Sequence, residues 1–255
     1  MPHKVFITGA SSGIGEALAR HYAAAGATLG LAARREPQLQ GLADSLSIPV
    51  RIYALDVADS AALAAAAQDF ITRYGVPDIV IANAGISAGT RGWKAEDIAV
   101  LAKIMNINVI ALAATLQPFV APMRARGSGA LVGIASVAGF RGMPGAGAYC
   151  ASKSAAITWL ESLRVEMHGS GVDVLTICPG FIATPLTAAN RNPMPFLLTA
   201  AEAARRIARA IAAKKRLAII PWQMRLLSVF LRRMPNWLYD RAFARAPRKT
   251  REPAA

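Results

Sequence analysis

The chain has 255 residues, of which 54 % are hydrophobic, so it can bury a large core, and disorder is excluded for most of its length. Its two cysteines, Cys150 and Cys178, provide no disulfide framework and no zinc or other metal motif, and they are typical of a protein of the reducing cytoplasm. The net charge of +14 is uneven: residues 205–255 carry fourteen Lys and Arg against Asp240 and Glu252, which leaves +2 for the first 204 residues.

The length and the even composition predict one domain rather than two. Residues Lys4 to Thr8 read as a buried strand, so we expect no targeting segment before them. Every apolar run of eighteen residues contains a charge or a proline, so we also expect no membrane-spanning helix. We expect residues 1–220 to form the domain and residues 221–255 to form a basic C-terminal extension.

Short apolar runs alternate with alanine-rich segments along the chain. The predicted strands are Val5–Thr8, Thr28–Ala32, Arg51–Leu55, Ile79–Ala82, Ala130–Ile134, Val172–Ile177 and Leu217–Ile220. The predicted helices are Gly15–Ala25, Ser60–Tyr74, Ile98–Met123, Tyr149–Met167 and Ala200–Ala213. This alternation predicts an α/β fold with a doubly wound, seven-stranded parallel sheet and helices on both faces. Ligands of such sheets bind at the carboxyl ends of the strands.

The turn after the first predicted strand reads Thr8-Gly9-Ala10-Ser11-Ser12-Gly13-Ile14-Gly15. Glycines between a strand and a helix let the backbone approach a pyrophosphate, and the helix N-terminus favours negative charge. The spacing G-x-x-x-G-x-G differs from the commonest dinucleotide fingerprint, and a glycine-rich turn can also be purely structural. Its place in the first strand–helix unit favours a nucleotide-binding turn.

Tyr149 and Lys153 are four residues apart in a predicted helix, so they share one face. An ammonium beside a phenol lowers the pKa of the phenol from about 10, so the phenol can act as an acid or base near neutral pH. Ser136, thirteen residues before Tyr149, offers a hydroxyl that can polarise a carbonyl. The alternative is a solvated surface pair with no catalytic role.

The glycine turn, Asn83-Ala84-Gly85, Ser136 and Tyr149-x-x-x-Lys153 stand in an order that resembles the short-chain dehydrogenase/reductase family over about residues 4–220. The resemblance implies a Rossmann-type fold and an oxidoreductase that uses a nicotinamide cofactor. It implies catalytic roles for Asn108, Ser136, Tyr149 and Lys153. The expected cofactor-binding residues are Thr8, Gly9, Ser11, Ser12, Gly13, Ile14, Gly15, Arg34, Arg35, Asp56, Val57, Asn83, Ala84, Gly85, Tyr149, Lys153, Pro179, Gly180, Ile182 and Thr184.

Several of these residues have simpler interpretations. Asp56 is placed to cap the helix that follows it, and Asn83-Ala84-Gly85 can be a strand-ending turn. Asn108 can lie on an exposed helical face. Ala111 stands where the family usually has glycine, a departure that concerns packing.

The choice between NAD and NADP depends on the end of the second strand. Enzymes that prefer NAD place an acid there, and in this family that position, eighteen residues after the last glycine of the turn, is Ala33. Arg34 and Arg35 follow it, and guanidinium groups suit a 2′-phosphate. The alternative is that both arginines are solvated, with Glu36 paired to one of them. The sequence therefore favours NADP(H) over NAD(H).

The resemblance implies a mechanism in which Tyr149 exchanges a proton with the substrate oxygen and Ser136 hydrogen-bonds the same oxygen. Lys153 is expected to lower the pKa of the phenol and to bind the nicotinamide ribose. Asn108 is expected to hold a water that connects Lys153 to solvent. Carbonyl reduction is the expected direction, because cytosolic NADP pools are generally reduced.

The segment 181–199 resembles the variable substrate lid of the family. Its apolar residues (Ile182, Leu186, Met194, Pro195, Phe196, Leu197 and Leu198) suit an apolar or bulky carbonyl compound, with charge only at Arg191. Ordinary packing is the alternative. We expect a small carbonyl or alcohol substrate, no nucleic acid partner and a homodimer or homotetramer.

The extension is expected to contain a helix between Pro221 and Pro235 that mixes apolar residues with Arg225, Arg232 and Arg233. It either packs on the domain or on a neighbouring subunit, lies on an anionic membrane surface through residues 221–251, or binds nucleic acid. The rival for the whole chain is a catalytically idle cofactor-binding protein that uses this basic segment for interaction. An epimerase or dehydratase would resemble the extended relatives, which are longer and have another glycine spacing.

Overall fold

A computed structural model describes residues 3–188, 190, 193–246 and 248–249. Its centre is a parallel sheet of seven strands in the order β3-β2-β1-β4-β5-β6-β9. The strands are β1 (Lys4–Thr8), β2 (Thr28–Ala33), β3 (Val50–Ala54), β4 (Ile79–Ala82), β5 (Gly129–Ile134), β6 (Val172–Pro179) and β9 (Leu217–Ile220). The predicted doubly wound α/β fold is confirmed, with strand ends that differ by one or two residues. The chain order reverses between β1 and β4, and this switch point is where such sheets bind ligands.

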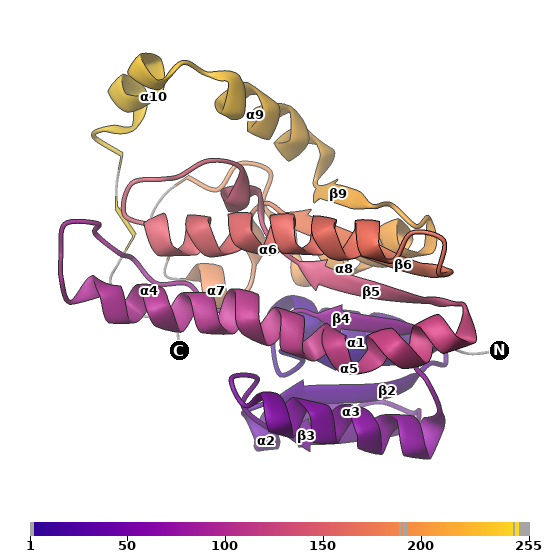
Figure 1. Cartoon of the computed structure of the whole chain (residues 1–255). Helices are drawn as coiled ribbons and strands as arrows, with labels where there is room; N and C mark the ends of the chain where they lie inside the picture. The colour runs from indigo at the N-terminus through magenta and orange to yellow at the C-terminus, as the bar shows by residue number, and fades with distance from the viewer. Residues whose placement is uncertain (1–2, 189, 191–192, 247, 250–255) are drawn as a thin grey trace.

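Helices cover both faces of the sheet (Figure 1). One face packs against α1 (Gly13–Ala24), α2 (Glu36–Asp44) and α8 (Ala200–Ala212), where Leu18, Leu39 and Ile207 are buried. The other packs against α3 (Ser60–Tyr74), α5 (Ala111–Arg126) and α6 (Gly147–Glu166), where Phe70 and Phe119 are buried. Because both faces are covered, the central strands read as apolar runs without alternation. The helix α2 was not predicted.

The predicted single helix Ile98–Met123 is divided into three pieces. The α-helix α4 (Asp97–Met105) passes into a π-helical turn, η1 (Asn106–Ile110), before α5 begins at Ala111. Residues 97–126 are long and apolar enough to pass for a membrane span by length and composition, which the sequence prediction did not expect. Of the apolar stretch 28 % is buried, and Leu116, Phe119 and Met123 lie fully buried against the sheet.

The segment after β6 contains two short parallel strands, β7 (Ile182–Ala183) and β8 (Leu198–Thr199), with the one-turn helix α7 (Pro185–Ala188) between them. This segment holds the predicted substrate lid. Phe196 and Leu197 are partly exposed within it, and Arg191 lies outside the described residues.

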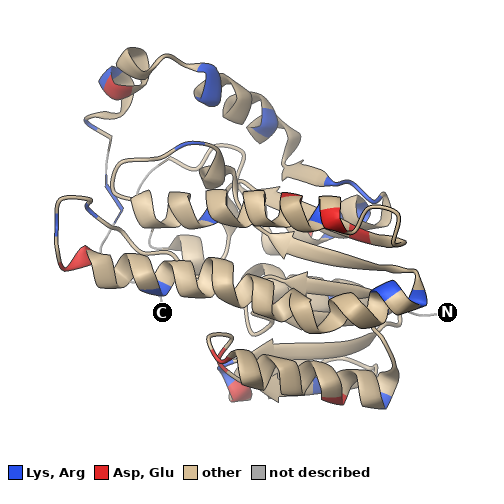
Figure 2. Cartoon of the chain, in the orientation of Figure 1, with Lys and Arg blue, Asp and Glu red and all other residues tan. Residues whose placement is uncertain are grey.

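The basic extension forms the helices α9 (Trp222–Arg233) and α10 (Asn236–Phe243), which lie outside the two layers that cover the sheet (Figures 1 and 2). Pro221 precedes α9 and Pro235 precedes α10, as the sequence indicated for the first helix. The guanidinium of Arg141 holds both helices: it donates to the carbonyl oxygens of Leu231 and, at 2.7 Å, of Met234, and it lies 3.9 Å from the centroid of the Tyr239 ring.

Candidate active site

A groove of about 500 Å³ runs along the carboxyl ends of the strands. The predicted site residues that line it are Gly9, Ser11, Ser12, Gly13, Ile14, Arg34, Arg35, Asp56, Val57, Asn83, Ala84, Gly85, Ser136, Tyr149, Lys153, Pro179, Gly180, Ile182 and Thr184. The other predicted site residues, Thr8, Gly15 and Asn108, do not line the groove and lie beneath the residues that do. Residues from seven separate segments thus converge on one hollow, as expected at a topological switch point.

The glycine positions of the turn leave no room for a side chain. Gly9 and Gly13 have φ values of +66° and +60°, a conformation that favours glycine. A Cβ on Gly15 would lie 2.2 Å from the carbonyl oxygen of Gly9. Ser12 precedes α1 in an extended conformation, and its hydroxyl does not cap the helix. The first N–H groups of α1 are therefore placed at the groove, where an anion suits them.

Asn83 ties the end of β4 to the glycine turn. Its side-chain amide donates to the carbonyl oxygens of Thr8 at 3.0 Å and Gly9 at 3.2 Å. The hydroxyl of Thr8 accepts in return from the backbone N–H of Asn83 at 3.2 Å and of Ala84 at 3.4 Å. Asn83 therefore does more than end a strand, because it links the two strands that flank the switch point.

The two arginines after β2 have different surroundings. Arg35 donates to the hydroxyl of Ser11 at 3.0 Å and to that of Ser12 at 2.7 Å, so its guanidinium lies beside the glycine turn. Arg34 faces Asp56 at 4.0 Å. Glu36, the partner considered from the sequence, begins α2 instead.

Asp56 does not cap the helix that follows it. Asp59 is the N-cap of α3 and accepts from the N–H groups of Ala61 and Ala62, while Asp56 accepts from the N–H of Ala58 at 2.9 Å. Asp56 and Val57 remain at the rim of the groove.

Asn108 is fully buried, which excludes the exposed helical face considered from the sequence. The wide turn η1 directs its amide towards the chain after β4. Its Oδ1 accepts from the N–H of Ile86 at 2.9 Å, and its Nδ2 donates to the carbonyl oxygen of Ile86 at 3.0 Å and to the Ser152 hydroxyl at 2.9 Å.

Lys153 and Tyr149 share the inner face of α6. The Nζ of Lys153 donates to the carbonyl oxygen of Ile134 at 2.9 Å and lies 5.8 Å from the centroid of the Tyr149 ring. Lys153 is buried and Tyr149 is partly buried, so the alternative of a solvated pair is excluded. Ser136 follows β5, accepts from the N–H of Ala138 at 3.1 Å and lies beside the phenol of Tyr149.

The pKa of Tyr149 is shifted in the direction opposite to the predicted one. Burial raises the pKa of Tyr149 to about 12, while the hydrogen bond with Ser136 acts to lower it. Burial lowers the pKa of Lys153 to about 8. The predicted net lowering of the pKa of the phenol is therefore not found in the chain alone, because removal from water outweighs the groups that lower it.

Ser152 was missed by the sequence reasoning. It is fully buried, donates to the carbonyl oxygen of Tyr149 at 2.8 Å and accepts from Asn108. Its position three residues after Tyr149 is a signal for such a bond, because a helical serine can donate to a carbonyl one turn earlier. Lys103 and Asn106 also line the groove, and no motif indicated them.

The family profile described as short chain dehydrogenase matches residues 3–195. A Myxococcus xanthus protein named uncharacterized oxidoreductase is 39 % identical over 94 % of this chain and 95 % of its own. The rat protein named dehydrogenase/reductase SDR family member 7B is 33 % identical over 97 % of this chain and 82 % of its own.

Solved structures agree in fold. A Burkholderia phymatum short chain dehydrogenase/reductase in complex with NAD has a TM-score of 0.82 at 27 % identity, with 96 % of each chain covered. A Thermococcus sibiricus alcohol dehydrogenase complexed with 5-hydroxy-NADP has a TM-score of 0.74 at 26 % identity, over 86 % of this chain and 94 % of its own. This chain belongs to the short-chain dehydrogenase/reductase family of oxidoreductases.

Proposed function

We propose that this chain is an NADP(H)-dependent oxidoreductase that interconverts a ketone or aldehyde with an alcohol, with Tyr149 as the general acid and base. One observation carries the proposal: the phenol of Tyr149, the hydroxyl of Ser136 and the ammonium of Lys153 line the same groove as the glycine turn. The catalytic unit is residues 1–220, and residues 221–255 are an extension of it.

The residues of the groove fit a nicotinamide dinucleotide. The glycine turn provides the bare backbone that a pyrophosphate needs, and Gly13 lies against Thr184. Arg35 with the hydroxyls of Ser11 and Ser12 forms a cationic, hydrogen-bonding corner suited to a 2′-phosphate. Ala33 supplies no carboxylate for a free 2′-hydroxyl. These contacts favour NADP(H).

The bound cofactor supplies or accepts the hydride. In the direction of reduction, Tyr149 donates its phenolic proton to the substrate oxygen, and Ser136 donates a hydrogen bond to the same oxygen. Burial raises the pKa of Tyr149 to about 12, so the phenol is in the protonated, donor form at neutral pH that the reduction step needs. Lys153 and Asn108 both approach Gly85, since a Cβ there would meet Oδ1 of Asn108 at 3.2 Å and Nζ of Lys153 at 3.5 Å. This narrow passage suits a proton path from Lys153 past Asn108.

The substrate is a small carbonyl or alcohol compound with an apolar or bulky body. Ile182 and Leu186 line the groove, and Phe196 and Leu197 are available in the lid. The active protein is a cytoplasmic homodimer or homotetramer. Exposed apolar residues, among them Ile110 at the end of η1 and Val165 on α6, supply subunit contacts of the needed kind. No role in nucleic acid binding is proposed.

The substitution Tyr149→Phe tests the proposal against the idle, cofactor-binding alternative. The proposed enzyme oxidises NADPH in the presence of some member of a panel of ketones, quinones, steroids and acyl thioesters. The variant loses this turnover by about a hundredfold or more and keeps its affinity for NADPH, because it retains the ring and loses only the proton. Unchanged turnover in the variant would falsify the mechanism, and NADPH binding without turnover of any carbonyl would favour the idle alternative.

A further inference from the structure

Two residues near the C-terminus return to the neighbourhood of Tyr149. The Nζ of Lys249 donates to the hydroxyl of Ser87 at 2.5 Å and lies 5.6 Å from the centroid of the Tyr149 ring. The neighbouring Arg248 lies 4.9 Å from the centroid of the Trp93 ring. Residues far apart in the sequence thus place a cation within a few ångströms of the proposed proton donor.

The charge of Lys249 has no carboxylate partner in the part of the chain that the structure describes. Its hydrogen-bond acceptor is the neutral hydroxyl of Ser87, which is itself buried. Lys249 is partly buried, and this partial removal from water lowers the pKa of its ammonium. A cation in such a place is normally paired with an anion.

We propose that Lys249 binds an anionic group of the substrate, a carboxylate or a phosphate, that lies a few bonds from the reacting carbonyl. The inference rests on the proposed function, because the substrate oxygen is taken to lie at Tyr149 and Ser136. The anionic group pairs with Lys249 while the apolar body lies towards the lid. The substrate class is then an amphiphilic ketone with one anionic end, or the corresponding alcohol.

A pair of matched ketones tests this inference: a 2-oxo acid and its uncharged methyl ester, each reduced with NADPH. The wild-type protein has a higher kcat/KM for the acid, and Lys249→Gln lowers the ratio of acid to ester by about ten- to a hundredfold. Lys249→Arg keeps the preference for the acid, and Lys249→Glu reverses it. Reversal depends on charge, whereas a loss of tail docking would change both substrates alike. The inference is overturned if the ratio of kcat/KM for acid to ester is the same in the wild type and in all three Lys249 variants.

A failure of the proposed function can be distinguished from a failure of the anion site. If the wild type reduces neither ketone and no carbonyl of the panel, the proposed function fails, and titration calorimetry of the NADPH-loaded protein with the 2-oxo acid then tests the anion site alone. Weaker binding to Lys249→Gln than to the wild type supports the site. Equal binding to both overturns it.

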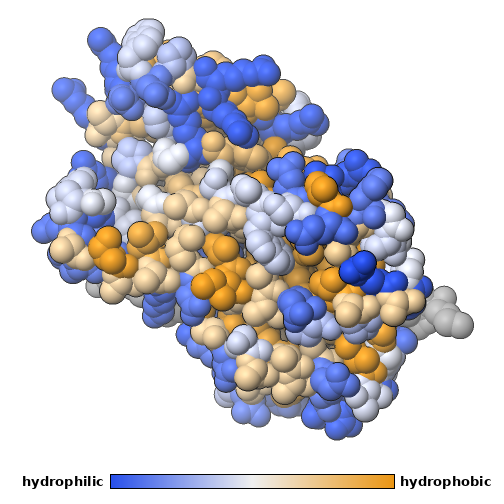
Figure 3. Space-filling view, in the orientation of Figure 1, coloured by the Kyte–Doolittle hydropathy of each residue, from blue (hydrophilic) through white to orange (hydrophobic). Residues whose placement is uncertain are grey.

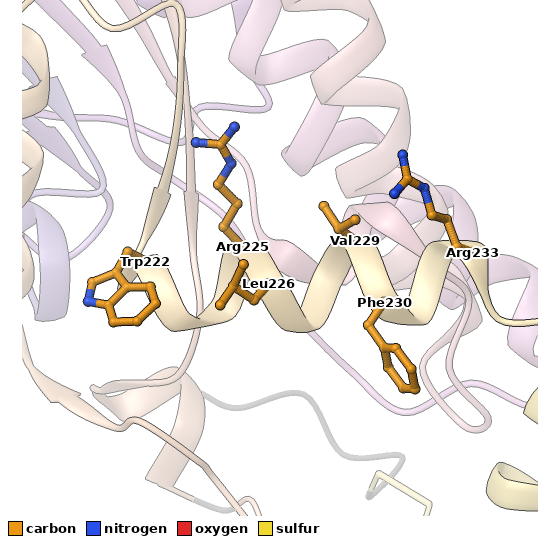
Figure 4. A pocket seen from close by; sticks show the side chains of 6 residues that line it. All are labelled: Trp222, Arg225, Leu226, Val229, Phe230 and Arg233. Atoms are coloured by element: carbon orange, nitrogen blue, oxygen red, sulfur yellow. The ribbon is translucent and has the colours of Figure 1, made fainter.

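An independent observation concerns the outer face of α9. Trp222, Leu226 and Phe230 form one row along it, four residues apart, with exposed fractions of 63 %, 63 % and 61 %. Arg225, Val229 and Arg233 form the adjacent row, and Figure 4 shows the two arginines extending away from the aromatic side chains. The inner face of the helix is occupied, because Met224 is buried against Gly180.

The charge around the outer face of α9 indicates which kind of partner this face binds. α9 contains three arginines and no acidic residue, and hydrophilic and hydrophobic side chains lie next to one another over this helix in Figure 3. A second copy placed on this face would bring two sets of arginines together. An anionic lipid surface satisfies both rows, since apolar side chains enter the interface and arginines remain at the head groups.

The geometry points to α9 as a peripheral contact with anionic lipid. The test is flotation of the full chain with vesicles of phosphatidylcholine containing about 30 % phosphatidylglycerol, compared with phosphatidylcholine alone. The wild type floats with the anionic vesicles. The pair Arg225→Gln and Arg233→Gln lowers the partition coefficient by about twenty-five-fold, which is roughly fivefold for each arginine.

Matched substitutions serve as controls. Arg124→Gln with Arg209→Gln removes the same net charge from other helices and leaves flotation within about twofold of the wild type. Leu226→Asp lowers flotation, whereas Ile98→Asp, at the same exposed fraction of 63 %, does not. Equal losses in the matched pairs overturn the proposal. So does a wild type that fails to float, or a stable dimer that Leu226→Asp dissociates in the absence of lipid.

Discussion

The ammonium of Lys153 donates a hydrogen bond to the carbonyl oxygen of Ile134, at the end of β5, and the Lys153 side chain is buried. Burial lowers the pKa of this lysine to about 8 from its usual value of 10.5. Desolvation of this ammonium therefore costs free energy in the folded chain and not in the unfolded chain. This cost accompanies the placement of a cation at the base of the groove.

We expect Lys153→Met to raise the free energy of unfolding at pH 7 by about 1 to 3 kcal/mol, since the variant has no ammonium to bury. Between pH 8 and 10.5 the unfolded wild type keeps a proton that the folded wild type releases, so wild-type stability gains on the variant as pH rises. Urea denaturation at pH 7 and pH 10 measures both values. The exposed Lys215→Met is the control, and an advantage of Lys153→Met that grows with pH would contradict the argument.

Removal of the Ser136 hydroxyl is expected to change the pH dependence of alcohol oxidation. Oxidation needs the deprotonated phenol, and the hydrogen bond from Ser136 opposes the rise in the pKa of Tyr149 that burial causes. In Ser136→Ala that pKa rises further, so the limb on which kcat/KM increases with pH moves to higher pH and the rate at pH 8 falls by about ten- to a thousandfold. Ser136→Thr keeps a hydroxyl and most of the activity. An unshifted limb in Ser136→Ala would separate Ser136 from the titration of Tyr149.

Cofactor preference is expected to depend on Arg35 more than on Arg34. Arg35→Ala removes the guanidinium that lies beside Ser11 and Ser12, so the Kd for NADPH rises by about ten- to a hundredfold while that for NADH changes little. Ala33→Asp adds the missing acid and moves the preference towards NADH. Fluorescence titration with both cofactors measures these changes. Arg51→Ala, at the edge strand β3, is the control, and an equal loss for NADH and NADPH in Arg35→Ala would count against a 2′-phosphate site.

Asn108 is expected to stabilise the fold as well as the site. Asn108→Leu leaves both backbone groups of Ile86 and the hydroxyl of Ser152 without their partner, so the free energy of unfolding falls by about 2 to 4 kcal/mol. Asn106→Leu changes a partly exposed residue of the same turn and costs less than about 1 kcal/mol. Urea denaturation compares the two, and equal losses would show that the turn, rather than its buried amide, determines the effect.

The glycine turn is expected to tolerate no added methyl group at Gly15. A Cβ there would lie 2.2 Å from a backbone oxygen, so Gly15→Ala shifts the turn, weakens NADPH binding at least tenfold and destabilises the chain. Gly41 lies in α2 with no atom within 4 Å of the added Cβ, so Gly41→Ala stabilises the helix by about 0.5 to 1 kcal/mol. Normal NADPH affinity in Gly15→Ala would show that the turn can relax.

The sheet and its motifs could be predicted because their signals are local. A strand buried on both faces has to be apolar along its whole length, and β1 and β4 met that rule with nearly correct ends. The glycine turn followed from position alone, directly after the first strand. The turn η1 could not be predicted, because a π-helical turn differs from an α-helix by one hydrogen-bond step, and its apolar composition is the same.

By itself, the sequence determined the fold class, the family and the chemical types of the groups in the groove, because these depend on residue order and local spacing. Only the tertiary structure decided what surrounds each group. It buried Asn108, brought Arg35 to Ser11, raised the pKa of Tyr149 and placed Lys249 beside its ring. These outcomes depend on desolvation and on contacts between distant segments, which no local pattern encodes.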